Sequence, residues 1–409
     1  MNFINGPTFY IESDWEDCLS KIARETWITC KFKDKSGQHG KVVRLNASSS
    51  PNSSVLSATE GFRVNLLTHN AIEVGLANSD FSTIFVAPRE IYSDIHEKSV
   101  VSLDVAEGLK CISVSSDCET EIVVWCAENR EKLRTFKEHV GAVYKCRWFP
   151  SGRVVLSCGA DMMLKIWCSE TGRCPVTLKG HTKAINDIAI VDKGRNIISV
   201  SKDGCCKLWN CGDARLIVNL LQVSTNINCC CLSTRPSDFS LPELSVSSDE
   251  REVGTEDKIL LIGCEDGSVY CVAVRSRKLL FTKKLDSAVN CCCCVKAGIF
   301  AVGCQSGNVY LLSVSVDHYI QMMWSETNSP ALSATPYKGK GFFVGHHDGS
   351  CVYRSVHDYQ CPVRLSLTGS NGDPIYDICC DENFVYTACR DSQVRRYSPD
   401  SYICRHFDS

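Results

Sequence analysis

The chain has 409 residues, a formal net charge of −3 and 22% charged side chains, so it lacks the basic excess that binds nucleic acid or anionic membranes. It contains no apolar run of about 18 residues, which excludes a transmembrane helix. Its 28 cysteines accompany no secretory signal. We therefore interpret them as small buried hydrophobic residues in a reducing compartment, the cytoplasm, with the nucleus as a second location.

Residues 1–80 show no internal repeat and form an N-terminal accessory region. Strand-like runs such as WITCKF and AIEVGLA lie on either side of the serine-rich loop NASSSPNSSVLSAT. Alternating apolar residues bounded by turn residues are typical of strands. We predict a small accessory β-unit that large aromatic residues anchor, namely Trp15, Trp27 and Phe62.

After this region a period of about 42 residues organises the chain. Trp125, Trp167 and Trp209 lie 42 residues apart, as do Asp161 and Asp203. Within each period, short β-branched and apolar runs alternate with Gly, Pro, Ser and Asp turns, which indicates antiparallel strands. Four strands in about 42 residues are typical of one blade of a WD40-type β-propeller.

A turn six residues before the tryptophan position allows the blades to be counted where tryptophan is lost. It falls at Glu119, Asp161, Asp203, Asp266, Ser306, Asp348 and Asp391. These seven turns predict an all-β fold, a seven-bladed WD40-type β-propeller over residues 81–409. The long step of 63 residues from Asp203 to Asp266 places an insertion at residues 234–257, between the first and second strands of blade four.

The seventh repeat ends after its third strand and needs a fourth strand from elsewhere. We predict that FSTIFVAP, residues 81–88, forms the outer strand of blade seven and latches the ring. A closed ring leaves no free sheet edge, which is the physical advantage of this architecture. The alternative for the fourth strand is YICRHF, residues 402–407.

Two blades carry a complete set of polar residues. Resemblance to WD40 blades implies that a histidine before the first strand meets the aspartate of the turn at one rim, and that a serine connects them to the tryptophan indole. Such a buried network must satisfy all its donors and acceptors. The same set recurs at the blade period, so we interpret it as structural and not as a hydrolase triad. The two sets are His139, Ser157, Asp161, Trp167 and His181, Ser199, Asp203, Trp209.

The insertion in blade four is acidic. Residues 243–257 carry six acidic side chains and one arginine. The segment is either a solvated, mobile insertion or an acidic handle that steers a basic partner. On the second interpretation the partner-binding residues include Glu250, Glu252, Glu256 and Asp257.

No catalytic motif is present, because the chain has no phosphate-binding loop, dinucleotide fingerprint, HExxH helix or nucleophile elbow. We therefore predict a protein that is not an enzyme and uses no cofactor. We also expect no metal site. Adjacent cysteines such as those of residues 291–294 point to opposite faces of a strand. The sequence HHD at residues 346–348 is better explained as a rim loop.

Several segments resemble the proteasomal ATPase-associated factors, a family of WD40 proteins. They span nearly the whole chain, including regions that no blade geometry requires. The matching segments are IESDW (11–15), ATEGFRVN (58–65), FPSGRVVLS (149–157), AIVDKGRN (189–196), SKDGCCKLWNCG (201–212), EREVGTE (250–256) and CRDSQVRRY (389–397). Blades four to seven depart from strong WD40 repeats, since they lack the tryptophan and the histidine.

The resemblance implies a monomeric, non-catalytic scaffold that binds AAA-type ATPase subunits of the proteasome regulatory particle. Such a protein acts as an assembly chaperone and restrains association of the regulatory particle with the proteolytic core. By position on the rim, we expect the contacts to include Tyr144, Lys183, Asn186, Arg390 and Arg395. The alternative is a WD40 substrate receptor or scaffold for another complex, such as a ubiquitin ligase. Those receptors commonly carry Trp-Asp-x-Arg, where this chain reads WCAE, WCSE and WNCG.

Overall fold

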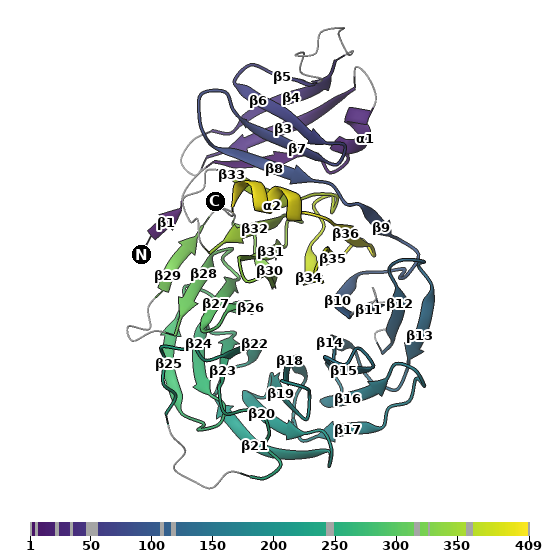
Figure 1. The fold of residues 1–409 in the computed structure, drawn as a ribbon, viewed down its shortest axis with the longest axis vertical. Coiled ribbons are helices and arrows are strands. Elements are labelled where there is room, and N and C mark those ends of the chain that lie inside the picture. The colour runs from purple at the N-terminus through teal and green to yellow at the C-terminus, as the bar shows by residue number, and fades with distance from the viewer. Residues whose placement is uncertain are drawn as a thin grey trace.

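The repeated segments form four-stranded antiparallel sheets arranged radially in a ring (Figure 1), with a channel at its centre. The computed structural model describes residues 2–4, 7–20, 24–32, 36–45, 56–106, 110–115, 120–242, 249–314, 320–325, 328–356 and 363–407. The turn residue Glu119 lies outside these ranges. The predicted WD40-type propeller of seven blades is confirmed.

Blades one to four follow one another along the chain, each starting with the strand next to the channel (Figure 1). Blade one consists of β10 (Val100–Ala106), β11 (Lys110–Ser115), β12 (Ile122–Cys126) and β13 (Lys132–Phe136). Blade two consists of β14 (Val143–Trp148), β15 (Val154–Gly159), β16 (Met163–Cys168) and β17 (Val176–Lys179). Blade three consists of β18 (Ile185–Val191), β19 (Asn196–Ser201), β20 (Cys205–Asn210) and β21 (Arg215–Gln222). Blade four consists of β22 (Ile227–Thr234), β23 (Lys258–Cys264), β24 (Ser268–Ala273) and β25 (Leu279–Lys284).

Blades five to seven complete the ring, and strands from the N-terminal region join each of them. Blade five consists of β26 (Val289–Lys296), β27 (Ile299–Cys304), β28 (Val309–Ser313) and β29 (Ile320–Trp324). Blade six consists of β30 (Ala331–Tyr337), β31 (Gly341–His346), β32 (Cys351–Ser355) and β33 (Val363–Leu367). Blade seven consists of β34 (Ile375–Cys380), β35 (Val385–Cys389), β36 (Val394–Tyr397) and β9 (Glu90–Tyr92).

The hydrophobic core lies between adjacent blades. One apolar cluster joins Ile198 and Leu208 of blade three to Leu260 and Ile262 of blade four. Middle strands are therefore buried on both faces, as in β23, where every residue is buried. This explains why these strands read as continuous apolar runs and not as alternating ones.

Ring closure differs from the prediction. The expected latch, residues 81–88, contains β8 (Ser82–Val86), which pairs in parallel with β33 of blade six and not with blade seven. The outer strand of blade seven is β9, antiparallel to β36. Pro88 ends the first pairing because it has no N–H to donate. The Arg89 N–H then donates to the Arg396 carbonyl (2.7 Å), and the chain enters blade seven.

The alternative prediction, that residues 402–407 form the fourth strand of blade seven, is also wrong. Those residues belong to helix α2 (Asp400–His406) and the residue after it. Tyr402, Ile403 and Phe407 are buried in a cluster with Tyr353 and Tyr397 of blades six and seven. These residues therefore cover the two blades as a helix and add no strand to them.

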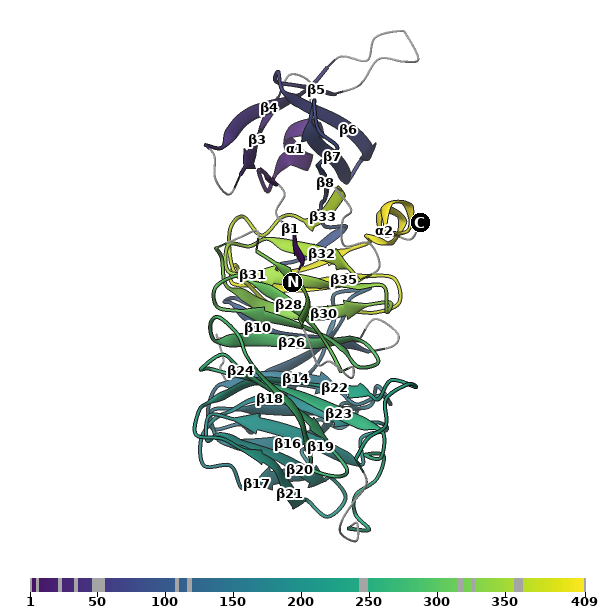
Figure 2. The ribbon, with the colours of Figure 1, turned by 90° about the vertical axis from the view of Figure 1, so that its left-hand side faces the viewer.

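The N-terminal unit is a sandwich beside blade six, and it extends from the edge of the disc (Figures 1 and 2). One sheet consists of β2 (Thr8–Ile11), β3 (Glu25–Lys31), β4 (Gln38–Arg44) and β5 (Leu56–Ala58). The other consists of β6 (Phe62–Thr68), β7 (Ala71–Leu76) and β8, and continues into blade six through β33. Helix α1 (Trp15–Ser20) supplies Trp15 to the core, where Phe62 is also buried, whereas Trp27 is 51% exposed.

The first strand, β1 (Asn2–Ile4), lies parallel to β29 at the outer edge of blade five. Together β1, β8 and β9 attach the N-terminal residues to blades five, six and seven. In the described ranges the longest helix has seven residues, far short of a membrane span. Every described cysteine has a free thiol.

Candidate partner-binding surfaces

The histidine networks of blades two and three have the same geometry. His139 Nδ1 lies 2.7 Å from Asp161 Oδ2, and its Nε2 lies 2.7 Å from Ser157 Oγ. The Trp167 indole donates to the same Ser157 Oγ (2.8 Å). The corresponding three distances in blade three, which join His181, Asp203, Ser199 and Trp209, are all 2.8 Å.

Every donor in this hydrogen-bond network meets an acceptor when the neutral histidine carries its proton on Nδ1. An indole can only donate, so the serine oxygen accepts from it and donates to Nε2, while Nδ1–H donates to the aspartate. Burial lowers the pKa of His181 below its ordinary value, which keeps the ring neutral near pH 7. Burial alone would raise the pKa of Asp203, but hydrogen bonds from the Thr182 N–H and from His181 lower it.

These two shifts predict that acid weakens the fold. Below pH of about 6.5 the unfolded state protonates His181 while the folded state resists protonation, so the free energy of unfolding falls with falling pH. The lowered pKa of Asp203 extends this loss below pH of about 4. We expect the stability difference between wild type and His181→Gln to shrink from pH 7 to pH 5 in urea titrations. Parallel pH profiles of the two proteins would contradict this assignment.

Blades four and seven keep the aspartate turn, but there a cation from a later strand of the blade pairs with the aspartate, Lys284 from β25 and Arg395 from β36. Lys284 Nζ lies 2.9 Å from Asp266 Oδ2 in blade four. In blade seven Arg395 forms an ion pair with Asp391, and a further hydrogen bond joins Arg395 Nη1 to Asp391 Oδ1 (3.1 Å). The Arg395 side chain is 3% exposed. The prediction that Arg395 contacts a partner is therefore wrong, because its guanidinium is buried and pairs with Asp391 within the blade.

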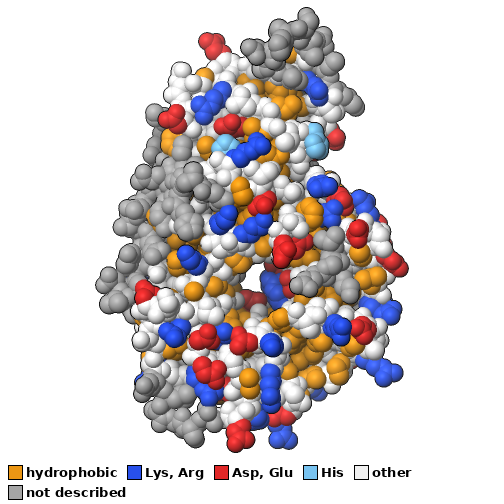
Figure 3. Space-filling view, viewed as in Figure 1, with side chains coloured by type: hydrophobic (Ala, Val, Ile, Leu, Met, Phe, Trp, Pro, Cys, Tyr) orange, Lys and Arg blue, Asp and Glu red, His pale blue; other side chains and the backbone are white. Residues whose placement is uncertain are grey.

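On the rim that carries the histidines, each blade has a register shift at the second residue of its first strand. A bulge leaves one residue unpaired and turns its side chain out of the ladder. All seven of these residues are partly buried and line the central channel, a cavity of about 600 Å³ that opens near the middle of the disc (Figure 3). They are Val101, Tyr144, Asn186, Asn228, Asn290, Leu332 and Tyr376.

These seven residues, which we call the mouth ring, divide into two arcs. In blades three, four and five the asparagine side chains donate to the carbonyl of the next blade, as Asn186 does to Ile227 (2.7 Å). In blades six, seven, one and two the ring is apolar or aromatic, and includes Tyr376 and Tyr144. Lys202 Nζ lies 5.5 Å from the centre of the Tyr144 ring. The mouth ring therefore combines an arc of apolar and aromatic residues with an arc of asparagines that hydrogen-bond to the neighbouring blade.

Four of the five residues predicted to contact a partner remain after Arg395 is excluded. Lys183 is exposed on the loop before β18. The side chain of Arg390 is 53% exposed and pairs with Asp373 (2.8 Å). Tyr144 and Asn186 belong to the mouth ring itself, although the Asn186 amide is engaged by blade four. Sequence reasoning missed Tyr376, whose signal is its place in IYDI, the counterpart of INDI at residues 185–188.

A second missed feature lies in the channel wall, where Asp377 joins three blades. Its carboxylate accepts from Lys145 Nζ (3.0 Å) and Arg147 Nη1 (3.2 Å) of blade two. It also accepts from the Ser102 hydroxyl (3.1 Å) and the Leu103 N–H (3.0 Å) of blade one. Burial alone would raise the pKa of Asp377, but these two cations lower it to about 2. The sequence offers one indication of this contact: two cations, Lys145 and Arg147, lie in one strand, and a carboxylate, Asp377, lies in another that is buried.

The cysteine-rich strands β22 and β26 form another part of the channel wall. Burial raises the pKa of Cys230 and of Cys293 well above the ordinary thiol value, so both stay protonated. A protonated thiol is a poor nucleophile and a poor metal ligand. Among the described residues no group of three acidic, histidine or cysteine side chains could hold a metal ion.

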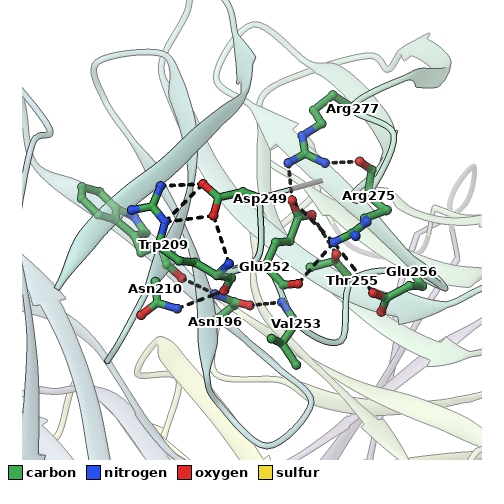
Figure 4. Close-up of polar contacts among 11 residues, drawn as sticks. Asn196, Trp209, Asn210, Asp249, Glu252, Val253, Thr255, Glu256, Arg275 and Arg277 are labelled. Atoms are coloured by element: carbon green, nitrogen blue, oxygen red, sulfur yellow. Dashed lines mark hydrogen bonds and ion pairs between the residues drawn. The ribbon is translucent and has the colours of Figure 1, made fainter. Parts of the chain in front are cut away.

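The acidic insertion is bound to blades three and four (Figure 4). The Asn196 and Asn210 side chains donate to the Arg251 carbonyl (3.1 and 3.0 Å). The Val253 N–H donates back to Asn196 Oδ1 (2.6 Å). Residues 249–257 are therefore fixed at their base, which contradicts a mobile insertion for this part. Residues 243–248 lie outside the described ranges.

The four acidic residues proposed for the handle have different roles. Glu252 is 4% exposed, forms an ion pair with Arg277 and accepts from the Thr255 hydroxyl (2.7 Å), so it cannot meet a partner. Asp257 pairs with Lys258 (3.0 Å). Glu250 and Glu256 remain exposed. The prediction for Glu252 is therefore wrong, since a buried carboxylate beside two arginines stabilises the loop.

We expect Glu252→Gln to lower the free energy of unfolding by about 2 kcal/mol, because it removes the carboxylate that pairs with Arg277 and leaves Arg275 with Glu256 alone. Glu250→Gln is the matched control and should change stability by less than about 0.5 kcal/mol, as surface substitutions usually do. Urea unfolding followed by circular dichroism measures both. Equal stability of the two variants would show that the buried pair contributes nothing.

Comparison with known proteins finds a family match to two repeats and relatives that align with nearly the whole chain. Residues 130–168 and 172–210 match the family described as WD domain, G-beta repeat. Proteasomal ATPase-associated factor 1 of Gallus gallus is 39% identical, over 96% of this chain and 98% of its own length. The human protein of that name is 39% identical, over 95% of this chain and 97% of its own. In Dictyostelium discoideum a probable proteasomal ATPase-associated factor 1 is 32% identical over 96% of both chains.

Proposed function

Because the chain belongs to the proteasomal ATPase-associated factor 1 family, we propose that it binds ATPase subunits of the proteasome regulatory particle as a non-catalytic scaffold. It acts as an assembly chaperone that restrains joining of the regulatory particle to the proteolytic core. It works as a monomer in the cytoplasm, with the nucleus as a second location. The observation that carries this proposal is the match to relatives over nearly their full length, including the N-terminal unit.

The mouth ring supports a binding role for the rim face. Aromatic residues in partly buried positions supply much of the energy of protein interfaces. Tyr144 and Tyr376 lie on blades two and seven, with Val101 of blade one between them in the ring order. The exposed bases Lys183 and Lys202 lie beside this arc on blade three. A rigid propeller holds these groups in place, so little conformational entropy is lost when a partner binds.

The direct test is co-purification of proteasomal ATPase subunits with the full-length protein, followed by crosslinking and mass spectrometry. We expect ATPase subunits to be recovered and their crosslinks to fall on the rim lysines. Recovery of no ATPase subunit at physiological salt would overturn the proposal.

The rim face is tested by the double variant Tyr144→Ala/Tyr376→Ala. We expect it to weaken ATPase binding at least tenfold, because truncating interface aromatics commonly costs about 2 kcal/mol or more. The matched control is Trp27→Ala, which removes an aromatic residue 51% exposed on the N-terminal unit. The affinity of each variant for the co-purified ATPase, measured by biolayer interferometry, decides between them. Equal losses in both variants would count against the rim face.

A further inference from the structure

A groove lies between the N-terminal unit and blade six, beside the outer strand β33 of that blade. Residues 8–13 form one wall and residues 367–372 the other, around a volume of about 270 Å³. Its floor is the parallel pair β8 and β33, which contributes Thr83, Phe85 and Ser366. The strand in the first wall, β2 (Thr8–Ile11), is four residues long and measures about 13 Å. The groove therefore has the shape of a slot for an extended chain.

One wall of the slot is an open sheet edge. β2 pairs with β3, and no other described strand joins it. The Glu12 N–H donates to the Trp27 carbonyl (3.3 Å). Hydrogen-bonded positions of an antiparallel ladder recur at every second residue, so Tyr10 also bonds toward β3. The N–H and C=O groups of Phe9 and Ile11 therefore point to the opposite edge, where a further strand could pair with them.

The charges that line the slot favour a basic ligand. Its lining contains three charged residues. Arg364 is buried, and its Nη1 donates to the Pro7 carbonyl (2.8 Å). Glu12 and Asp348 are exposed on the two walls. Glu12 Oε2 also accepts from the Trp27 N–H (2.9 Å) and the Thr26 hydroxyl (3.2 Å) of β3. The accessible charge in the slot is consequently negative.

We propose that this slot binds an extended segment of another protein, which pairs as an added strand with β2 and places a lysine or arginine side chain between Glu12 and Asp348. Backbone pairing supplies affinity and the floor receives alternate side chains, as in other cases of strand addition. The carboxylates select a basic sequence. This inference does not depend on the proposed ATPase partner, since the groove shares no lining residue with the central channel and is tested with peptides of random sequence.

The test screens a displayed library of random dodecapeptides against the full-length protein and measures the selected peptides by fluorescence anisotropy. We expect selected sequences to alternate apolar and polar residues and to contain lysine or arginine. Ile11→Pro removes a free-edge N–H at a position where an edge strand tolerates proline, and should weaken binding at least tenfold. Ile11→Val keeps the N–H and should stay within twofold of wild type. Asp348→Asn should weaken binding about threefold to tenfold.

A second readout does not depend on how the proline variant folds. In the wild type, saturating peptide should slow amide hydrogen exchange of Phe9 and Ile11 at least tenfold and leave Tyr10 nearly unchanged. The proposal is overturned if no peptide is selected, if Ile11→Pro and Ile11→Val bind equally, or if the exchange of Phe9 and Ile11 does not respond. Dimerisation of the free protein through the slot, seen by sedimentation and abolished by Ile11→Pro, would identify a second copy as the occupant and overturn it too.

Discussion

Replacing Asp377 by alanine should lower the free energy of unfolding by about 3–5 kcal/mol, the usual effect of removing one partner of a buried ion pair. The carboxylate is 3% exposed and holds Lys145 and Arg147 of blade two. It also accepts from the Leu103 N–H of blade one. Without it two cations and a backbone donor in the channel wall lose their acceptor, at the seam where the last blade meets the first.

The matched control is Asp373→Ala on the same blade. Asp373 pairs with Arg390 (2.8 Å), whose side chain is 53% exposed, and exposed pairs contribute about 0–1 kcal/mol. Urea unfolding followed by circular dichroism gives both values. A loss below about 1 kcal/mol for Asp377→Ala would show that Asp377 does not hold the seam.

Trp167→Ala should destabilise the protein by about 3–5 kcal/mol, because it leaves a large cavity and removes a donor from the network of blade two. The indole is 1% exposed and stacks on Phe136, with ring centres 5.0 Å apart and planes at 5°. It also donates to Ser157 (2.8 Å). Trp167→Phe should recover more than half of the loss, since it fills most of the volume without restoring the hydrogen bond.

Trp27→Ala is the control for this experiment, because it removes the same type of side chain from an exposed position. Trp27 is 51% exposed and contacts Lys41, whose Nζ lies 4.4 Å from the ring centre. Its removal should change the free energy of unfolding by less than about 1 kcal/mol. If both tryptophan variants lost the same stability, the blade network could not be the cause of the effect at Trp167.

The N-terminal residues have a structural consequence for the whole ring. β1, β8 and β9 add strands to blades five, six and seven in turn. These blades lack the tryptophan and the histidine network that stabilise blades two and three. Backbone pairing from outside the repeats thus reinforces the part of the ring where the internal networks are absent. This also explains how a propeller can close although its last repeat ends after three strands.

The candidate site shows where sequence reasoning reaches its limit. Arg395 and Glu252 are charged residues in polar segments, and both were expected at the surface. The structure buries them with partners, Asp391 for Arg395 and Arg277 for Glu252. A pattern of charges along the chain gives no distance between a carboxylate and a cation that lie 25 residues apart, as Glu252 and Arg277 do.

The local sequence by itself determined the propeller, its seven repeats and its family. Each blade is a short-range unit whose strand runs, turn residues and repeated Trp, His and Asp positions lie within about 42 residues, so periodicity reveals them. Ring closure, the tie at Asp377 and the open edge of β2 were decided only by the tertiary structure. Ring closure and the Asp377 contacts depend on residues hundreds of positions apart, such as Leu103 and Asp377, and the edge of β2 is open because no other described strand joins it. β8 and β9 are both short strands, and only their place in the closed ring determines which blade each one joins.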